Sequence, residues 1–233
     1  WMIRRPALQI RNNVMKKWPI FILTGFLFAN SGFANEPENL SIHKAALIRY
    51  HDSGEYAKDV EVVIQNSLNY IENEIKSNAY QDKKPAIVLD IDETTLSNFN
   101  HLKQLDFGGT SEQIQTMEDI GDDPAIEPTL RLYQYAKAHH IAVFFVTGRT
   151  EPERLSTIAN LKRVGFHDWD GLYLKPSAYV NAKTAALYKT EVRKKIVSRG
   201  FEIIANIGDQ QSDLVGGFAD KTFKLPNPYY FIA

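Results

Sequence analysis

The sequence predicts an α/β protein with a doubly wound parallel sheet. Two observations lead to this fold class: short apolar runs typical of buried strands recur along the chain, and helical segments lie between them. Strands that alternate with helices are joined by parallel crossovers, which place helices on both faces of the sheet. A third observation is that several strands end in polar residues, and such sheets bind ligands beyond their strand ends.

The first predicted elements are N-terminal helices followed by a buried strand. The helical pattern consists of apolar residues at steps of three and four, namely Val60, Val63, Ile64, Leu68, Ile71 and Ile75. This spacing places them on one face of a helix, which we expect to pack on the sheet. The segment Ala86–Ile91 is a continuous apolar run, which predicts the first buried strand.

A helix, a strand and a further helix come next. We predict a helix over Thr129–His139 and a buried strand over Ile141–Val146. Thr150 and Glu153 have the spacing of a capping box, which marks the start of the next helix. The inner face of that helix is expected to consist of Leu155, Ile158 and Leu161.

The alternation continues to the C-terminal part of the chain. Leu172–Leu174 is predicted to be a short strand, and Ala185–Arg199 a helix that Gly200 can end. Glu202–Ile207 is the last predicted strand. Since no repeat or long linker interrupts residues 35–233, we expect them to form one domain.

The first 34 residues have a different character from the rest. They contain five Lys or Arg residues and no acid, together with an apolar run too short to span a bilayer and then small residues. This order predicts a secretory signal peptide over residues 1–34, with Met15 as a plausible start and a periplasmic or secreted product. The alternative interpretation is a membrane anchor that is not cleaved.

Charge and cysteine content exclude several function classes. The whole chain has a formal net charge of −1, and removal of the five cations in residues 1–34 leaves −6. An acidic domain lacks the surplus of cations that binding to a nucleic-acid polymer or an anionic membrane requires. The absence of cysteine excludes thiol nucleophiles, thiolate metal sites and a lipid-modified Cys.

The ends of three predicted strands carry the candidate functional residues. The first strand runs into Asp90 and Asp92, the second into Thr147-Gly148-Arg149, and the last into Asp209 and Asp213. Buried carboxylates are unfavourable unless they are paired or bind a metal. Such a gathering at one sheet edge therefore indicates a site for a polyvalent cation or for catalysis.

These residues lie in segments that resemble the haloacid dehalogenase (HAD) superfamily, and specifically the subfamily IIIB acid phosphatases. This subfamily includes plant-type acid phosphatases, vegetative storage proteins and bacterial relatives. The similar segments are LDIDETTLSN (89–98), FVTGR (145–149), YKTEVR (188–193), NIGDQQSDL (206–214) and TFKLPNP (222–228). The similarity extends from about residue 40 to the C-terminus.

The resemblance implies roles for the catalytic residues. Asp90 would be the nucleophile that forms an aspartyl-phosphate, and Asp92 the general acid and base. Thr147, Gly148 and Lys189 would bind the phosphoryl group.

The resemblance also implies a metal. Mg²⁺ would be held by the carboxylates of Asp90 and Asp209 and by the backbone carbonyl of Asp92. Asp213 would hold a metal-bound water or support Lys189. Lys175, which also follows a strand, is the alternative phosphate-binding lysine.

Together these features predict an exported, Mg²⁺-dependent acid phosphatase that acts on small phosphomonoesters. The alternatives are a storage or binding protein with little activity, and a phosphotransferase with the same residues. In the superfamily the segment after the first strand forms a cap, and here residues 100–127 are short for one. We therefore expect a short cap insert, an open cleft and broad substrate tolerance. The sequence specifies neither one natural substrate nor an oligomeric state.

Overall fold

The computed structural model describes residues 36–77, 80, 83–179 and 184–232. Residues 38–233 form one compact unit, which contains the sheet, its helices and the candidate site. The predicted signal peptide at residues 1–34 lies outside the described residues and stays a prediction. None of the described helices combines the length and apolar composition needed to cross a bilayer.

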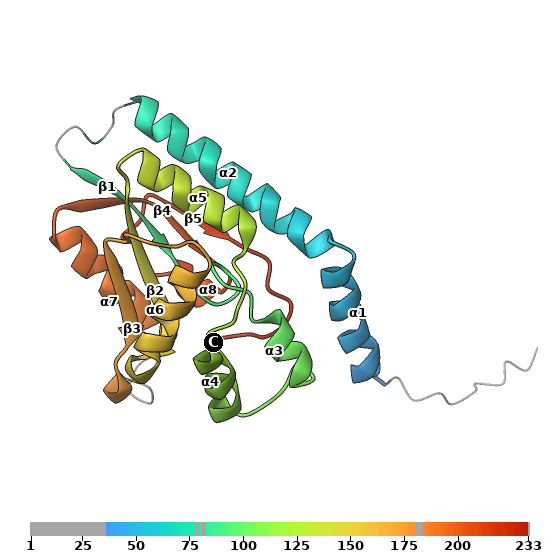
Figure 1. The fold of residues 1–233 in the computed structure, drawn as a ribbon. Coiled ribbons are helices and arrows are strands. Elements are labelled where there is room, and N and C mark those ends of the chain that lie inside the picture. The colour runs from blue at the N-terminus through green and yellow to red at the C-terminus, as the bar shows by residue number, and fades with distance from the viewer. Residues whose placement is uncertain (1–35, 78–79, 81–82, 180–183, 233) are drawn as a thin grey trace, which may run out of the picture. The chain divides into compact units, whose positions relative to one another are not determined.

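A parallel sheet of five strands forms the centre of the unit (Figure 1). Its strand order is β3-β2-β1-β4-β5, and every neighbouring pair is parallel. The strands are β1 (Lys84–Leu89), β2 (Ala142–Thr150), β3 (Gly171–Lys175), β4 (Phe201–Gly208) and β5 (Lys221–Lys224). This architecture confirms the predicted doubly wound α/β fold.

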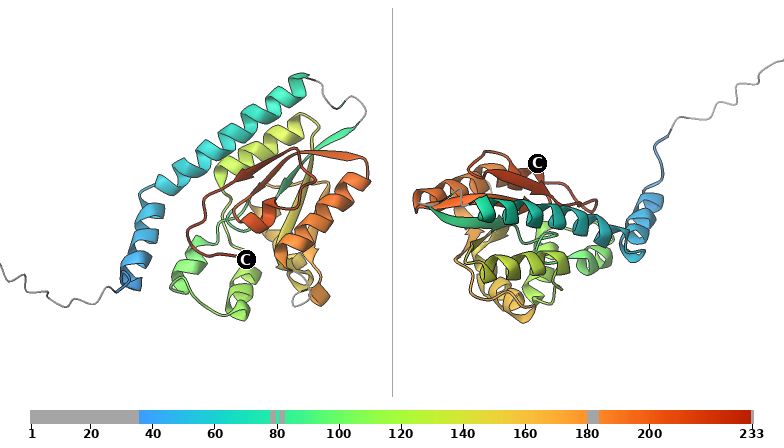
Figure 2. Two further views of the ribbon diagram at one scale, coloured as in Figure 1. Left: turned by 180° about the vertical axis from the view of Figure 1, so that it is seen from behind. Right: turned by 90° about the horizontal axis from the view of Figure 1, so that it is seen from above.

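Helices precede the sheet and connect its strands. The α-helices are α1 (Leu40–Asp52), α2 (Glu55–Ser77), α3 (Phe99–Gln104), α4 (Ser111–Ile120), α5 (Glu127–Ala138), α6 (Arg154–Arg163), α7 (Ala185–Ser198) and α8 (Gln211–Leu214). Two short 3-10 turns, Glu151–Glu153 and Ser177–Tyr179, follow β2 and β3. Figures 1 and 2 show α2 and α5 side by side along the sheet.

The hydrophobic core has two layers because side chains alternate between the faces of a strand. On β1, Ile87 and Leu89 join the layer that contains Ile64 and Ile71 of α2. The intervening residues of β1 face the layer formed with α7, whose core residues are Tyr188, Val192 and Ile196. The apolar face predicted for α2 is thus packed on the sheet as expected.

Two details differ from the predictions. Leu155, expected on the inner face of α6, has 79% of its surface exposed, whereas Leu161 is fully buried. The turn before α6 is a 3-10 turn, so the α-helix begins only at Arg154 and not at the predicted capping box. The prediction did not include β5, nor the helices α3 and α4 within residues 100–127.

The order of the strands determines where a ligand can bind. The chain moves from β1 outward to β2 and β3, and then returns to place β4 on the other side of β1. The ends of β1 and β4 are therefore adjacent at the switch in strand order, with Leu89 paired to Ile207. The backbone N–H of Asp90 donates to the carbonyl of Ile207 over 3.0 Å. Such a switch is the usual binding crevice of an open α/β sheet.

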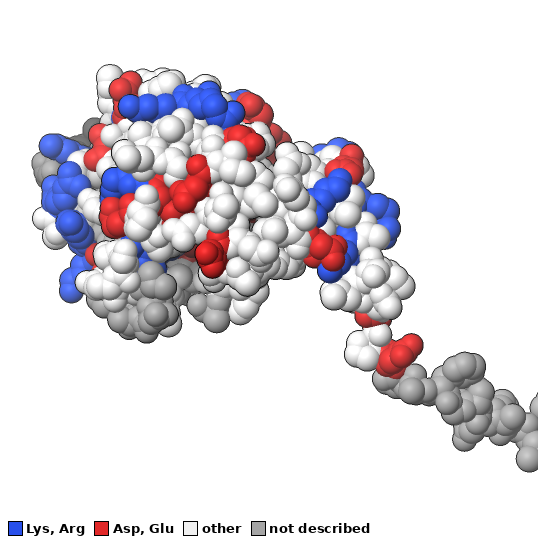
Figure 3. All heavy atoms as spheres, turned by 60° about the horizontal axis from the view of Figure 1, so that its bottom comes forward, with Lys and Arg blue, Asp and Glu red and all other residues white. Residues whose placement is uncertain are grey.

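The charged residues seen from the lower side of Figure 1 are mixed in sign. Figure 3 shows Lys and Arg side chains interspersed with Asp and Glu, and uncharged residues between them. A face of this kind does not present the continuous positive charge that a polyanion binds most strongly.

Candidate active site

The ends of β1 and β4 bring together a lysine and two carboxylates. The Lys189 ammonium group donates to Asp90 Oδ1 and to Asp213 Oδ1, both over 2.5 Å. All three residues are at most 5% exposed. Lys189 belongs to α7, which packs on the face of the sheet opposite α2. The packing of α7 therefore places the Lys189 ammonium group at the strand ends.

Two features of the backbone make this close approach possible. A Cβ atom on Gly208 would lie 2.4 Å from the Cβ of Asp213, so only glycine leaves room for that side chain. Arg193, which is fully buried in α7, donates to the carbonyls of Asp213 (2.6 Å) and Gly217 (2.9 Å). Arg193 thus ties α7 to the loop after β4 and fixes the distance between Lys189 and Asp213.

Asp209 adds a third buried carboxylate next to this group. It is 1% exposed and accepts hydrogen bonds from Thr94 (3.0 Å) and from Asn227 and Gln210 (both 2.7 Å). Carboxylate oxygens of Asp90, Asp209 and Asp213 all lie within 4.8 Å of one another. Three hard oxygen donors at this spacing, with one lysine as the direct ion-pair partner, fit a divalent cation such as Mg²⁺.

The electrostatics of the group show an excess of negative charge. Burial raises the pKa of Asp90 well above its ordinary value, and the charge of Asp213 raises it further against the opposing effect of Lys189. Burial also raises the pKa of Asp209, with Asp213 again contributing. Burial opposes the charged form of Lys189, but Asp213 and Asp90 outweigh it, so the pKa of Lys189 is raised. Positive charge added here would stabilise the ionised carboxylates.

Asp92 has a different environment from Asp90, although it is only two residues away. The Arg149 guanidinium donates to Asp92 Oδ1 through Nη2 (2.6 Å) and Nε (3.0 Å), and Asn98 Nδ2 donates to the same oxygen (2.8 Å). Burial raises the pKa of Asp92, but the charge and hydrogen bonds of Arg149 prevail and the pKa is lowered. Thr147 Oγ1 lies 3.5 Å from Asp92 Oδ2 and accepts from the N–H of Arg149.

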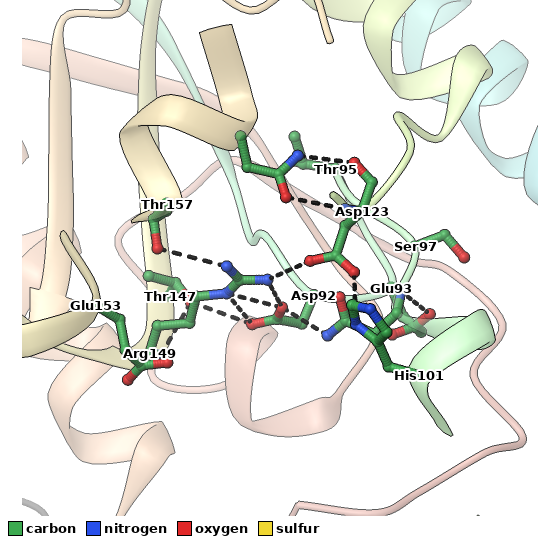
Figure 4. Close-up of polar contacts among 12 residues, drawn as sticks. Asp92, Glu93, Thr95, Ser97, His101, Asp123, Thr147, Arg149, Glu153 and Thr157 are labelled. Atoms are coloured by element: carbon green, nitrogen blue, oxygen red, sulfur yellow. Dashed lines mark hydrogen bonds and ion pairs between the residues drawn. The ribbon is translucent and has the colours of Figure 1, made fainter. Parts of the chain in front are cut away.

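Arg149 also contacts a carboxylate from the insert, as Figure 4 shows. Its Nη2 lies 3.3 Å from Oδ2 of Asp123, a residue that is 2% exposed. His101 lies between Asp123 Oδ1 (3.1 Å) and Asp122 Oδ1 (3.0 Å). Spacing along the chain does not reveal these partners of His101, because they come from a loop about twenty positions later. The role of Arg149 was missed as well, although it lies in the quoted FVTGR segment.

The strand ends border a cavity of about 840 Å³, although Thr147 and Asp123 are not among the residues that line it. Asp90, Asp92 and Lys189 line it together with Gly148, and Lys175 lies on its wall too. Much of the remaining wall is apolar and comes from the insert and the C-terminal segment, namely Leu105, Phe107, Met117, Tyr229, Tyr230 and Phe231. The insert is thus short, as predicted, and its two helices form part of this wall.

The predicted lysines therefore differ in their surroundings. Lys189 contacts Asp90 directly, whereas Lys175 has no ion-pair or hydrogen-bond partner among the described residues and burial lowers its pKa. Thr147 is fully buried, and Gly148 is exposed at the cavity.

Glu118 of α4 is a further acidic residue of the cavity that the sequence did not single out. Burial raises the pKa of Glu118 from 4.5 to about 10, and the negative charge of Asp92 and the nearby Glu153 add to this effect. Glu153 accepts from the N–H (2.6 Å) and Oγ1 (2.7 Å) of Thr150, as the predicted capping box requires of its acidic residue. The raised pKa favours the neutral form of Glu118.

Residues 30–233 match the family described as HAD superfamily, subfamily IIIB (acid phosphatase), and the chain belongs to this family. The match covers the sheet, the insert and all the residues described above. It confirms the resemblance and the predicted class of phosphoric monoester hydrolases.

Individual relatives support the same assignment. The chain is 36% identical over 190 residues to acid phosphatase 1 of Solanum lycopersicum, covering 78% of this chain and 66% of that protein. It is 34% identical over 206 residues to the stem 28 kDa glycoprotein of Glycine max, covering 86% and 78%. The class C acid phosphatase of Bacillus anthracis has a similar fold, with a TM-score of 0.69, 22% identity, and coverage of 82% and 86%.

Proposed function

We propose that the protein is an exported, Mg²⁺-dependent acid phosphatase that hydrolyses small phosphomonoesters through an aspartyl-phosphate on Asp90. The observation that carries this proposal is the position of Asp90. Its carboxylate lies at the end of a central strand, in contact with Lys189, within a group of buried acids that open onto the cavity. A nucleophile, a positive charge and a place for a divalent cation are what phosphoryl transfer needs.

In the first step, an oxygen of Asp90 attacks the phosphorus and the bond from phosphorus to the ester oxygen breaks. Lys189 stabilises negative charge on the phosphoryl oxygens and on Asp90. Thr147 and Gly148 bind the phosphoryl group from the end of β2. Asp92 gives its proton to the leaving oxygen, so that a neutral alcohol departs and Asp92 is left ionised.

In the second step, a water molecule replaces the alcohol. Asp92 takes a proton from the water, whose oxygen attacks the phosphorus, and the bond to Asp90 breaks. Inorganic phosphate leaves, and both aspartates return to their starting states. Because Arg149 lowers the pKa of Asp92 against the effect of burial, Asp92 carries the proton it must donate only in acidic solution, so we expect the rate to rise as pH falls.

Mg²⁺ would be held by Asp90, Asp209 and the backbone carbonyl of Asp92. Among the described residues no N–H group donates to that carbonyl, so it is available as a ligand. When bound, the cation supplies charge neutralisation for the phosphoryl oxygens and for the three clustered acids. Asp213 holds Lys189 in place and accepts from the N–H of Gln210 through its other oxygen (2.8 Å).

The substrates we propose are small phosphomonoesters, because the cavity is bounded by the insert and the C-terminal segment. The apolar part of its wall can contact the non-polar part of a leaving group without requiring a particular charged group on it. This composition supports the predicted broad substrate tolerance. Export rests on the residue pattern of positions 1–34.

The decisive experiment compares wild type with Asp90→Asn in the hydrolysis of p-nitrophenyl phosphate from about pH 4 to 8, with Mg²⁺ or with EDTA. We expect Asp90→Asn to lose at least about 10³-fold in kcat, because covalent catalysis has no substitute nucleophile. EDTA should reduce the wild-type rate strongly, and Mg²⁺ should restore it. Acid quenching should trap the phosphorylated wild-type protein for mass analysis, and Asp90→Asn should not be phosphorylated.

Asp106→Asn is the matched control. Its side chain is 79% exposed and its backbone has a positive φ, which asparagine tolerates well. It should keep wild-type activity. Equal rates for wild type and Asp90→Asn would overturn the nucleophile assignment. Wild-type protein that is folded and inactive with every divalent metal would instead favour the storage or binding function.

A further inference from the structure

The insert contacts the acid–base side of the site through one buried carboxylate. Asp123 follows α4 and the left-handed Gly121 that ends this helix. Its Oδ2 lies 3.3 Å from Nη2 of Arg149, the same nitrogen that donates to Asp92 over 2.6 Å. Arg149 therefore joins an insert residue to the proposed general acid and base (Figure 4).

The backbone of Asp123 is held firmly against α6. Asn160, which is fully buried, accepts from the N–H of Asp123 (3.0 Å) and donates to its carbonyl (2.7 Å). Arg163 donates to the same carbonyl (3.1 Å) and to that of Gly121 (3.2 Å). Two side chains of one helix thus fix the loop, and the position of the carboxylate does not depend on its contact with Arg149 alone.

His101 lies on the other side of the Asp123 carboxylate from Arg149. The His101 ring, whose side chain is 12% exposed, places Nδ1 3.1 Å from Asp123 Oδ1. With His101 on one oxygen and Arg149 on the other, both oxygens of Asp123 have cationic or polar partners. The contact of Oδ2 with Nη2 limits the orientations open to the guanidinium.

Arg149 needs such a partner because its side chain is only 1% exposed. Without Asp123, the guanidinium would keep only Asp92 and the Thr157 hydroxyl, which lies 3.4 Å from Nη1, as partners among the described residues, and its Nη2 end could turn away. Asp123 holds the end of the guanidinium, so that Nε and Nη2 stay directed at Asp92. The general acid is then presented to the leaving oxygen in one position, as efficient proton transfer requires.

We propose that Asp123 of the insert is a positioning residue, which orients Asp92 through Arg149 for proton donation to the leaving group. This inference rests on the proposed function, since it takes Asp92 as the general acid. It gives the insert a role in catalysis besides that of a cavity wall. It also predicts that the loss of Asp123 is felt most by substrates whose leaving group depends on a proton.

The test compares two substrates in the same protein preparation. Glycerol 2-phosphate releases an alkoxide unless it is protonated, whereas p-nitrophenyl phosphate releases a stable phenolate. The quantity measured is the ratio of kcat/KM for the alkyl ester to that for the aryl ester. This ratio reports steps up to the covalent intermediate and does not depend on the fraction of protein that is folded.

For Asp123→Asn we expect the alkyl-to-aryl ratio to fall about tenfold. This is smaller than the effect of losing general acid catalysis completely, because Asp92 itself is still present. If this variant is not soluble, Asp123→Glu replaces it, because the longer side chain displaces the carboxylate while keeping its charge. A ratio within about twofold of wild type would overturn the inference, since proton donation would then not depend on Asp123.

Two variants separate positioning from general loosening of the insert. Arg163→Met removes two contacts to the loop but leaves the Asp123 carboxylate in place, and Asp122→Asn changes the exposed partner of His101. Both should keep the wild-type ratio, even where Arg163→Met lowers the melting temperature. A fall in the ratio for Arg163→Met equal to that for Asp123→Asn would overturn the inference.

The failure of the proposed function gives a different result. It would appear as wild-type protein that hydrolyses neither ester, or as an Asp90→Asn variant that hydrolyses both at the wild-type rate. An active wild type, an inactive Asp90→Asn and an unchanged ratio in Asp123→Asn would contradict the positioning role alone.

Discussion

The two sides of the site each contain one buried cation between two carboxylates, and they differ in their balance of charge. Lys189 is the cation of the first side and Arg149 that of the second. The carboxylate pairs are Asp90 with Asp213, and Asp92 with Asp123. On the first side Asp209 adds another acid, and burial with Asp213 raises the pKa of Asp90. On the second side Arg149 lowers the pKa of Asp92 despite its burial.

This difference indicates how the two sides divide the chemistry. The first side has more negative charge than its lysine balances, which favours a divalent cation and a phosphoryl group there. On the second side Arg149 donates to Asp92 through two nitrogens, so this arginine can control the orientation and the pKa of Asp92. The first side is built by the sheet and α7, whereas the second also uses the insert.

The largest expected effect comes from removing the cation of the first side. Lys189→Met should lower kcat by about 10³-fold or more, because Asp90, Asp213 and the transferred phosphoryl group lose their common positive partner. Steady-state kinetics with p-nitrophenyl phosphate at saturating Mg²⁺ measures this loss. Circular dichroism checks that the buried carboxylates remain in a folded protein.

Lys175→Met is the matched comparison for the same wall of the cavity. Because Lys175 does not contact Asp90 or Asp213, we expect its loss to lower kcat less than about threefold. The reverse order, with Lys175→Met far more damaging than Lys189→Met, would assign phosphate binding to Lys175 and break the proposed division of the site.

A smaller effect is expected from changing the cation of the second side while keeping its charge. Arg149→Lys loses the two-nitrogen contact with Asp92, and we expect kcat to fall about tenfold with KM changed less than about threefold. Arg154→Lys is the control, because Arg154 makes a comparable two-nitrogen contact with Glu151 on the surface. Equal effects of the two substitutions would show that Arg149 has no special function.

The smallest effect concerns the stability of the second side. The pKa of Glu118 is raised from 4.5 to about 10, so the folded protein binds this proton more tightly than the unfolded chain does. The corresponding stability is complete below about pH 4.5 and declines as pH rises towards about 10. Glu118→Gln removes this dependence and should raise the melting temperature by about 2–4 °C at about pH 8.

The same substitution should change the melting temperature much less near pH 4.5, where Glu118 is protonated in the folded state and half protonated in the unfolded chain. Glu112→Gln, an exposed residue of the same helix, serves as the control. A gain for Glu118→Gln that is equal at both pH values would contradict the raised pKa of Glu118.

Much of the fold and of the first side could be predicted from the sequence. Continuous apolar segments such as Ile141–Val146 lie close to the observed strands, because a strand buried on both faces needs apolar residues throughout. Lys189 and the strand-end aspartates belong to the quoted segments YKTEVR, LDIDETTLSN and NIGDQQSDL. In these segments neighbouring residues must also be of a particular type. Gly208 illustrates this, since no other residue leaves room for Asp213.

The second side could not be predicted in the same way. Asp123 lies in a polar loop whose sequence resembles any surface segment, and its burial depends on tertiary contacts with Asn160 and Arg163. His101 is placed by α3, a helix of six residues that has no strong sequence signal. Long-range contacts decide both positions, whereas patterns along the chain report mainly local structure.

The strand order has a consequence for how the molecule acquires its activity. Lys189 and Asp90 are 99 positions apart in the sequence, and Thr94 bonds to Asp209 across 115 positions. A sheet whose central strand pairs with much later segments forms slowly, because distant parts of the chain must first meet. A chain whose synthesis stops before β4 is complete would contain Asp90 but not Asp209. The recovery of phosphatase activity after unfolding therefore measures refolding directly, because a partly assembled sheet contains no catalytic centre.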